Sequence, residues 1–266
     1  MESNAVKLWG ALILCRCNCI IQKLFDFIVI KTKNKYNATK NNVEGDKNME
    51  LRGSKINFLG DSITFGHGTT ALEKTFCKLI ENRYGAVCRN YGICGTRIAR
   101  QRTGTNPDYD TNDFCARAVK MDKDADAVVV FGGTNDFGHG DAPLGTMNDR
   151  TPDTFYGALH TLYTSLLEIY TGKPIVVVTP LHRTNEDNPR GDGNKSSDVG
   201  TLKVYVDIIR EVAEYYSLPV LDLYKNSGMQ PKVSVIRETY IPDGLHPNDK
   251  GHMLIAEKIS EFLKTI

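Results

Sequence analysis

The 266-residue sequence has little net charge and no long apolar run. Its 33 Lys and Arg nearly balance its 32 Asp and Glu, which gives a formal net charge of +1. A basic surface that would attract nucleic acid is therefore not expected, and we predict no nucleic-acid partner. The apolar stretch 8–14 is soon interrupted by Arg16, Lys23 and Asp26. The roughly 20 continuous apolar residues of a membrane span are missing, so the sequence predicts no stable membrane insertion.

The seven cysteines do not form a pattern typical of a disulfide framework. Their number is odd, their spacing is irregular, and the chain is long enough to bury a core without covalent links. Three of them form the cluster Cys15, Cys17 and Cys19. No histidine or fourth cysteine follows at the spacing of a zinc finger. We expect no metal and no cofactor, and the role of the cluster stays open.

The first fifty residues differ from the rest of the chain. Residues 31–48 are rich in Lys and Asn and nearly free of apolar side chains, which is typical of a disordered or linker segment. The apolar stretch 8–14 resembles a short signal-peptide core, but no convincing cleavage site follows. Residues 1–50 are therefore a signal, a linker or the result of a misassigned start. In the last case the natural protein would begin at Met49. We favour an extension or a start at Met49, and a cytoplasmic over a secreted protein, with one domain over 51–266.

From residue 51 onward, strand-like and helix-like patterns alternate. Apolar runs that predict strands occupy residues 56–59, 86–91, 127–131, 175–179 and 219–222. Continuous Val and Ile runs are typical of strands buried on both faces of a parallel sheet. Patterns that predict helices occupy residues 72–84, 153–170, 202–216 and 253–263. This alternation predicts an α/β fold, a three-layer sandwich of about five parallel strands with helices on both faces.

Two predicted loops are longer than the two to six residues usual in such folds. They span residues 101–113 and 181–200, and both are rich in Asn, Asp, Arg and Thr. Long polar loops at strand ends are where binding sites occur in parallel sheets. Simple surface variation explains them equally well.

Four short segments follow predicted strands or precede the last helix. They are Gly60-Asp61-Ser62-Ile63-Thr64, Asn90-Tyr91-Gly92-Ile93-Cys94-Gly95-Thr96, Gly132-Gly133-Thr134-Asn135-Asp136 and Asp243-Gly244-Leu245-His246-Pro247-Asn248. Each alone is typical of a turn or a helix cap. Their joint occurrence, each beside an expected strand end or helix start, favours a catalytic site instead.

The residue types in these segments suit acyl transfer. The reaction needs a nucleophile, a base beside it, a group that orients the base, and donors for the oxyanion. We predict Ser62 as the nucleophile, His246 as the base and Asp243, three residues earlier, as the orienting carboxylate. The backbone N–H groups of Ser62 and Gly95 and the side-chain amide of Asn135 are the predicted oxyanion donors.

The same segments resemble the four motif blocks of the SGNH hydrolase superfamily, also called GDSL esterases and lipases. The resemblance runs from about 51 to 266 and implies that the family's Ser, Gly, Asn and His, with its Asp, correspond to Ser62, Gly95, Asn135, His246 and Asp243. It implies a flavodoxin-like fold, no metal, and hydrolysis of esters or thioesters. The G-x-S-x-G motif of α/β-hydrolases is absent, because position 64 is Thr.

Other polar residues are candidates for the surroundings of the site. They are Asp61, Asp136, His139, His182 and Arg183. We expect Asp61 to bond nearby backbone and Asp136 to cap or brace the turn at Asn135, while the other three are candidates for lining a pocket. His160 and His252 fall in predicted helices, where we expect them at the surface or the edge of the core.

The sequence thus predicts a serine esterase that works through an acyl-enzyme. The polar loops favour a small acyl group such as acetyl on a carbohydrate or another polar substrate, and the alternative is a lysophospholipase or acyl-thioesterase for longer chains. Metal-dependent hydrolysis is another alternative, with a cation held by Asp61, Asp136, Asp243 and His246. It would leave Ser62, Gly95 and Asn135 without a role. A non-catalytic binding module is a further alternative. The sequence does not set the oligomeric state.

Overall fold

The computed structural model describes residues 49–102 and 112–266. Residues 1–48 and 103–111 lie outside the described part. Most of the extension 1–50, with Cys15, Cys17 and Cys19, therefore lies outside the described residues. The same is true of most of the predicted loop 101–113.

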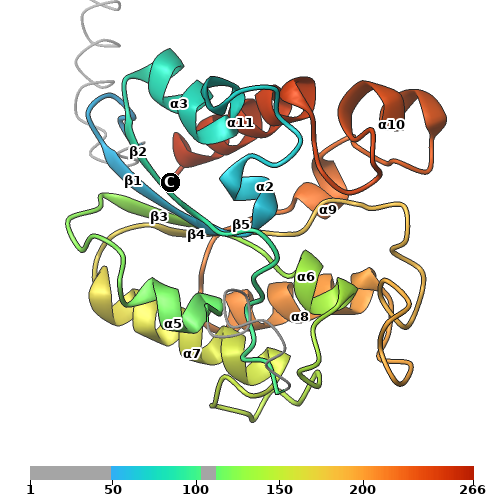
Figure 1. Cartoon of the computed structure of the whole chain (residues 1–266). Coiled ribbons are helices and arrows are strands. Elements are labelled where there is room, and N and C mark those ends of the chain that lie inside the picture. The colour runs from blue at the N-terminus through green and yellow to red at the C-terminus, as the bar shows by residue number, and fades with distance from the viewer. Residues whose placement is uncertain (1–48, 103–111) are drawn as a thin grey trace, which may run out of the picture. The chain divides into compact units, whose positions relative to one another are not determined.

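One five-stranded sheet forms the middle layer (Figure 1). The strands are β1 (Lys55–Gly60), β2 (Val87–Gly92), β3 (Ala127–Phe131), β4 (Ile175–Val178) and β5 (Val220–Leu221). Their order is β2-β1-β3-β4-β5, and every neighbouring pair is parallel. This is the flavodoxin-like order of a doubly wound sheet. The predicted α/β class with five parallel strands is confirmed.

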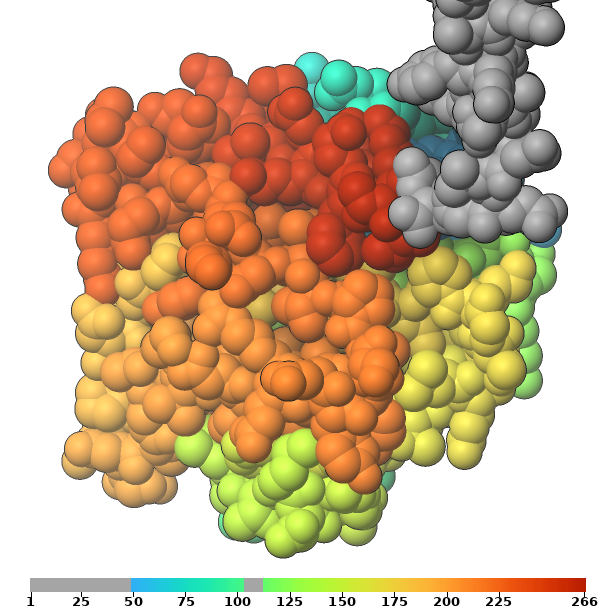
Figure 2. All heavy atoms as spheres, turned by 180° about the vertical axis from the view of Figure 1, so that it is seen from behind, coloured from blue at the N-terminus to red at the C-terminus, as the bar shows by residue number. Residues whose placement is uncertain are grey.

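Helices cover both faces of the sheet (Figure 1). One face carries α3 (Phe76–Tyr84) and α11 (Asp249–Leu263), and the other carries α5 (Phe114–Ala118), α7 (Phe155–Ile169) and α8 (Leu202–Tyr215). The shorter elements are α2 (Ser62–Phe65), η1 (Leu72–Lys74), α6 (Thr134–Gly138), α9 (Leu223–Asn226) and α10 (Ser234–Tyr240). From behind, the orange and red segments of the last third of the chain make up most of the visible face (Figure 2). None of the helices in the described ranges is long and apolar enough to cross a membrane.

Alternate residues of the central strand point into two separate cores. Val128 and Val130 pack with the apolar side chains of α7 and α8, whereas Val129 and Phe131 pack with those of α3 and α11. All five residues of β3 are buried, which explains why its sequence is continuously apolar rather than alternating. The sheet is thus held from both sides, and its carboxyl edge presents the loops that carry the polar segments.

Two helix boundaries differ from the sequence-based expectation. The pattern over 72–84 predicts one helix, but the chain is extended at Thr75, with φ −66 and ψ 146, and the Thr75 side chain caps α3. The last helix begins at Asp249 rather than at 253, because the Asn248 side chain accepts hydrogen bonds from the first backbone N–H groups. The first residues of α3 and α11 are therefore determined by capping side chains and not by the spacing of apolar residues.

The expectation that His160 and His252 lie at the surface or the core edge is wrong. Only 1% of His160 and none of His252 is exposed. His160 Nδ1 lies 3.0 Å from the hydroxyl of Tyr216. His252 Nδ1 accepts from the backbone N–H of Phe76 at 3.2 Å, and the two rings are stacked. In each buried ring, Nδ1 therefore has a partner inside the protein.

Candidate active site

The turn after β1 positions Ser62 through a close backbone approach. A Cβ on Gly60 would lie 1.9 Å from Thr64 Oγ1 and 2.9 Å from the carbonyl oxygen of Phe131, so no larger residue fits there. Asp61 then caps α2 by accepting from the backbone N–H of Ile63 at 3.0 Å. Asp61 is buried, and burial raises the pKa of its carboxyl to about 7. The turn places Ser62 at the first position of α2, at the carboxyl edge of the sheet.

Ser62, His246 and Asp243 form a continuous chain of hydrogen bonds. Ser62 Oγ lies 3.0 Å from His246 Nε2, and His246 Nδ1 lies 2.7 Å from Asp243 Oδ2. The other carboxylate oxygen of Asp243 accepts from the backbone N–H groups of Leu245 at 2.8 Å and His246 at 2.6 Å. The tight turn thus fixes the carboxylate, and the carboxylate fixes the imidazole.

The electrostatics of the site keep His246 neutral and Asp243 ionised. Burial lowers the pKa of His246, although the hydrogen bond to Asp243 acts in the opposite direction. Partial burial raises the pKa of Asp243, but the backbone and side-chain hydrogen bonds from His246 outweigh it and the net pKa is lowered. A carboxylate only accepts hydrogen bonds, so the His246 proton resides on Nδ1. The lone pair of Nε2 is then directed to Ser62.

The loop after α2 packs directly on the segment that carries His246. A Cβ on Gly68 would lie 2.5 Å from the carbonyl oxygen of Pro247, which shows how closely the two backbones approach. Thr70 donates to the carboxylate of Asp249 through its backbone N–H at 2.9 Å and through its hydroxyl at 2.7 Å. These contacts join Ser62 and His246, which are 184 positions apart in the chain.

Helix α6 holds the stretch that follows Gly95. The Asn135 side chain donates to the carbonyl of Thr96 at 3.0 Å, and Asn135 is only 4% exposed. The two carboxylate oxygens of Asp136 accept from the backbone N–H groups of Ile98 and Ala99, both at 2.9 Å. Asp136 was expected to cap or brace the turn at Asn135. It instead reaches across to a second segment, and burial raises its pKa.

Arg117 is a residue of the site that sequence reasoning missed. Arg117 is 7% exposed, and its guanidinium donates to the carbonyls of Gly60 at 3.0 Å and of Tyr91, and to the hydroxyl of Thr96 at 2.9 Å. These acceptors stand at the ends of β1 and β2 and next to Gly95. Burial lowers the pKa of Arg117 to about 10. An arginine within a short helical stretch carries no sequence signal for such a role.

The three candidate pocket residues have different environments. His182 Nδ1 lies 2.7 Å from Glu186 Oε2, and its ring lies against that of Tyr224. Arg183 is 5% exposed and donates to the carbonyl of Thr134 at 3.2 Å. Its guanidinium is also paired with Asp192. Both side chains are therefore engaged within the protein.

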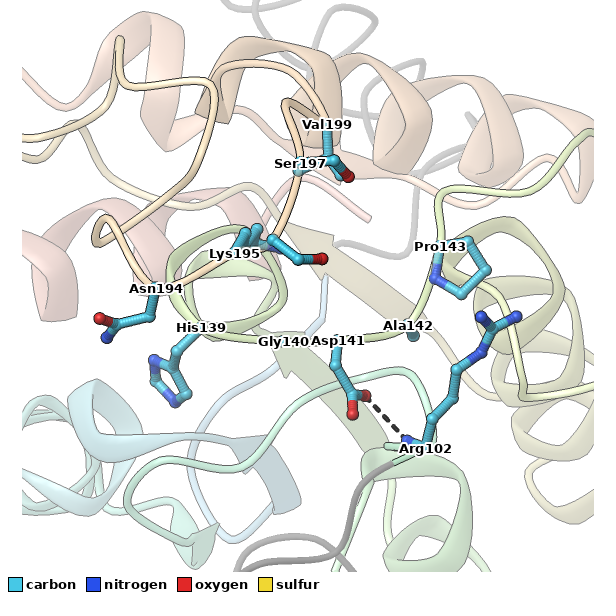
Figure 3. A pocket seen from close by; sticks show the side chains of 11 residues that line it. Arg102, His139, Gly140, Asp141, Ala142, Pro143, Asn194, Lys195, Ser197 and Val199 are labelled. Atoms are coloured by element: carbon cyan, nitrogen blue, oxygen red, sulfur yellow. Dashed lines mark hydrogen bonds between the residues drawn. The ribbon is translucent and has the colours of Figure 1, made fainter.

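His139 lines a cavity of about 450 Å³ whose lining does not include Ser62, Asp243 or His246 (Figure 3). The other lining residues are Arg102, Gly140, Asp141, Ala142, Pro143, Asn194, Lys195, Ser196, Ser197 and Val199. Most of their side chains are polar or charged. The cavity wall begins one helical turn after Asn135, because the backbone N–H groups of His139 and Gly140 both donate to the Asn135 carbonyl, at 3.0 and 2.8 Å.

Comparison with known families identifies the domain. The GDSL-like Lipase/Acylhydrolase family matches residues 58–254, a span that includes Ser62 and His246. The chain belongs to this family. It is accordingly a GDSL-type hydrolase that acts on ester bonds. No curated protein matches the sequence significantly.

Solved structures share the fold of this GDSL-type hydrolase. A protein from Lactobacillus plantarum is 29% identical, with 80% of this chain and 97% of that chain covered and a TM-score of 0.69. The lipase/acylhydrolase from Enterococcus faecalis is 24% identical, with 79% and 95% covered and a TM-score of 0.56. A two-domain esterase active on acetylated mannans is 21% identical, with 81% of this chain and 51% of that chain covered and a TM-score of 0.51.

Proposed function

We propose that this hydrolase is a serine esterase in which Ser62 is the nucleophile, His246 the general base and Asp243 the group that orients the base. The observation that carries the proposal is the chain of hydrogen bonds from Ser62 Oγ through the imidazole to the carboxylate, at 3.0 and 2.7 Å. A neutral imidazole held between a hydroxyl and a carboxylate is the arrangement that activates a serine.

The first half-reaction forms an acyl-enzyme. Ser62 Oγ attacks the ester carbonyl carbon while its proton passes to His246 Nε2, and Asp243 stabilises the imidazolium that results. The tetrahedral intermediate collapses when its C–O bond breaks and His246 returns the proton to the leaving alcohol. Water then attacks the acyl-enzyme with His246 again as the base, which releases the acid and restores Ser62.

Three donors are assigned to the oxyanion. Ser62 is the first residue of α2, so its backbone N–H has no acceptor within the helix. Gly95 offers a backbone N–H on the segment that Arg117 and α6 hold. The Asn135 amide has two N–H groups, of which one donates to Thr96 and the other is assigned to the oxyanion. One such donor typically contributes about 10²–10³ in kcat.

The substrate that we propose is a small acyl ester, such as acetyl, on a carbohydrate or another polar alcohol. The cavity beside α6 begins four residues after Asn135, and its lining includes charged and hydroxyl side chains, which supports a polar substrate. An esterase active on acetylated mannans has the same fold, which is compatible with this substrate class.

Initial rates on p-nitrophenyl acetate, butyrate and octanoate test the proposal. We expect the fastest turnover on acetate, a decrease with chain length, and loss of nearly all activity in Ser62→Ala. Ser234→Ala, which removes an exposed hydroxyl on α10, is the matched control and should behave like the wild type. Circular dichroism of both variants verifies that they are folded.

The other outcomes are equally informative. A preference for octanoate would indicate a hydrolase of longer acyl chains, such as a lysophospholipase or acyl-thioesterase. Unchanged turnover by folded Ser62→Ala would contradict the assigned nucleophile. Loss of activity in EDTA would indicate metal-dependent hydrolysis, although Asp136 already uses both carboxylate oxygens for backbone N–H groups.

A further inference from the structure

A second imidazole lies beside the proposed general base. The ring centroids of His67 and His246 are 4.3 Å apart, with an angle of 58° between the planes. His67 is exposed in the loop that follows α2. One ligand atom each from His67, Asp243 and His246 can be chosen so that all three lie within 4.8 Å of one another. The acyl-transfer mechanism gives His67 no role.

We propose that His67, Asp243 and His246 form a binding site for a divalent cation of the zinc class, and that the bound ion inhibits the esterase. Two imidazoles and one carboxylate are ligands that suit Zn²⁺, which takes protein ligands in a tetrahedral arrangement. The fourth position would be left to water. The inhibitory effect rests on the proposed function, whereas the binding site itself does not.

The spacing of the three side chains is close to that of a bound site. Ligand atoms about 2.0–2.2 Å from a tetrahedral Zn²⁺ are roughly 3.3–3.6 Å apart. The three atoms are within 4.8 Å of one another, so side-chain movements of roughly 1 Å would bring them to this spacing. The three ligands are therefore already neighbours before an ion binds.

The loop backbone already holds His67 over the active site. The backbone N–H of His67 donates to the carbonyl of Ser62 at 2.9 Å. The next residue, Gly68, packs against Pro247, and a Cβ there would be 3.3 Å from His246 Cβ. The position of His67 relative to His246 is therefore fixed by local contacts, which lowers the entropic cost of bringing the ligands together.

A cation at this site prevents His246 from acting as the general base. If the ion binds His246 Nε2, the lone pair that would accept the Ser62 proton is occupied. If it binds Nδ1, the ring loses its hydrogen bond to Asp243 and its orientation. No covalent bond forms in either case, so removal of the ion restores activity.

The first experiment measures p-nitrophenyl acetate hydrolysis at pH 8 over a buffered series of free Zn²⁺. The wild type should be inhibited and should recover after EDTA is added. His67→Gln, measured relative to its own rate without Zn²⁺, should require at least tenfold more Zn²⁺ for the same fractional inhibition. His139→Gln is the matched control, because His139 also lies beside a carboxylate, at 3.6 Å from Asp192, but is not one of the three proposed ligands. It should retain the sensitivity of the wild type.

A direct binding measurement separates this inference from the proposed function. Equilibrium dialysis of the full chain against Zn²⁺ should show one more bound ion per chain in the wild type and in His139→Gln than in His67→Gln. Comparison between variants cancels ions held elsewhere, for example by cysteines. Equal binding by all three proteins, or equal inhibition of His67→Gln and wild type, would overturn the site. A difference in binding without any esterase activity would support the site and reject the proposed function.

Discussion

The buried guanidinium of Arg117 donates a hydrogen bond of 3.0 Å to the carbonyl of Gly60, two residues before Ser62. The same group bonds the carbonyl of Tyr91 and the hydroxyl of Thr96. One side chain from α5 therefore sets the relative positions of two strand ends, one leading to Ser62, the proposed nucleophile, and one to Gly95. The carboxyl edge of the sheet is fixed by a residue that need not touch substrate.

Replacement of Arg117 by Lys should lower both stability and turnover. A lysine keeps the charge, but its compact ammonium does not reproduce the planar fork that reaches four acceptors. We expect a loss of about 1–3 kcal/mol in unfolding free energy and of about tenfold or more in kcat. Denaturant unfolding and p-nitrophenyl acetate kinetics measure the two effects. Arg190→Lys, at an exposed ion pair with Asp198, should change stability by less than about 1 kcal/mol.

Replacement of Asp243 by Asn should remove most of the catalytic rate without unfolding the domain. An amide of the same shape no longer fixes the Nδ1–H tautomer or stabilises the imidazolium, and the expected loss in kcat is about 10³–10⁴. Asp198→Asn, which alters an exposed carboxylate on the loop after β4, is the control. A variant within tenfold of wild type would show that the carboxylate has no part in the reaction.

The pH dependence of kcat/KM should follow the neutral form of His246. Activity requires the unprotonated ring, so the rate rises as the pH passes the pKa of His246, which burial places below its usual 6.5. Asp243 raises that pKa, so Asp243→Asn should move the residual acidic limb to still lower pH. An acidic limb displaced above 6.5 in the wild type would contradict this assignment.

Replacement of Asp136 by Asn should impair catalysis by loosening the segment after Gly95. An asparagine side chain has one acceptor oxygen, so one of the N–H groups of Ile98 and Ala99 loses its partner. A displacement of about 1 Å in a catalytic segment typically costs up to about 10² in rate. Asp149→Asn is a suitable control, because Asp149 accepts from Thr146 in an exposed turn. Equal kcat in the two variants would count against the bracing role.

Buried His252 should make the domain less stable as the pH falls from 8 to 5. Burial lowers the pKa of His252 from 6.5 to about 4, so between these values the unfolded chain binds the proton and the folded chain does not. The resulting stability is complete above 6.5 and is lost progressively toward 4. By pH 5 the loss is about 2 kcal/mol. Unfolding of His252→Gln should show a smaller change between the two pH values than that of His139→Gln.

The sheet could be predicted from sequence because its signal is local. The Val128-Val129-Val130 run occupies the centre of a strand buried on both faces, and nothing distant is needed to recognise it. Ser62 and His246 were likewise indicated by the motifs around them. The helix starts were less predictable, because Thr75 interrupts an otherwise continuous apolar pattern through a single capping side chain.

The supporting residues could not be predicted, because their partners are remote in the chain. Arg117 bonds Gly60, 57 positions away, and Asp136 bonds Ile98, 38 positions away. The burial of His252 depends on the packing of α11 against α3, which brings its ring to Phe76, 176 positions away. Local sequence patterns do not identify partners that are so far apart in the chain.

The distance of 184 positions between Ser62 and His246 also makes the site sensitive to any cut in the chain. The proposed nucleophile belongs to the turn after the first strand and the proposed base to the segment before the last helix, so no contiguous half contains both. A protease that nicks a surface loop between them leaves activity only while the two fragments stay associated. Hydrolysis of an ester is therefore an assay of the integrity of the whole domain.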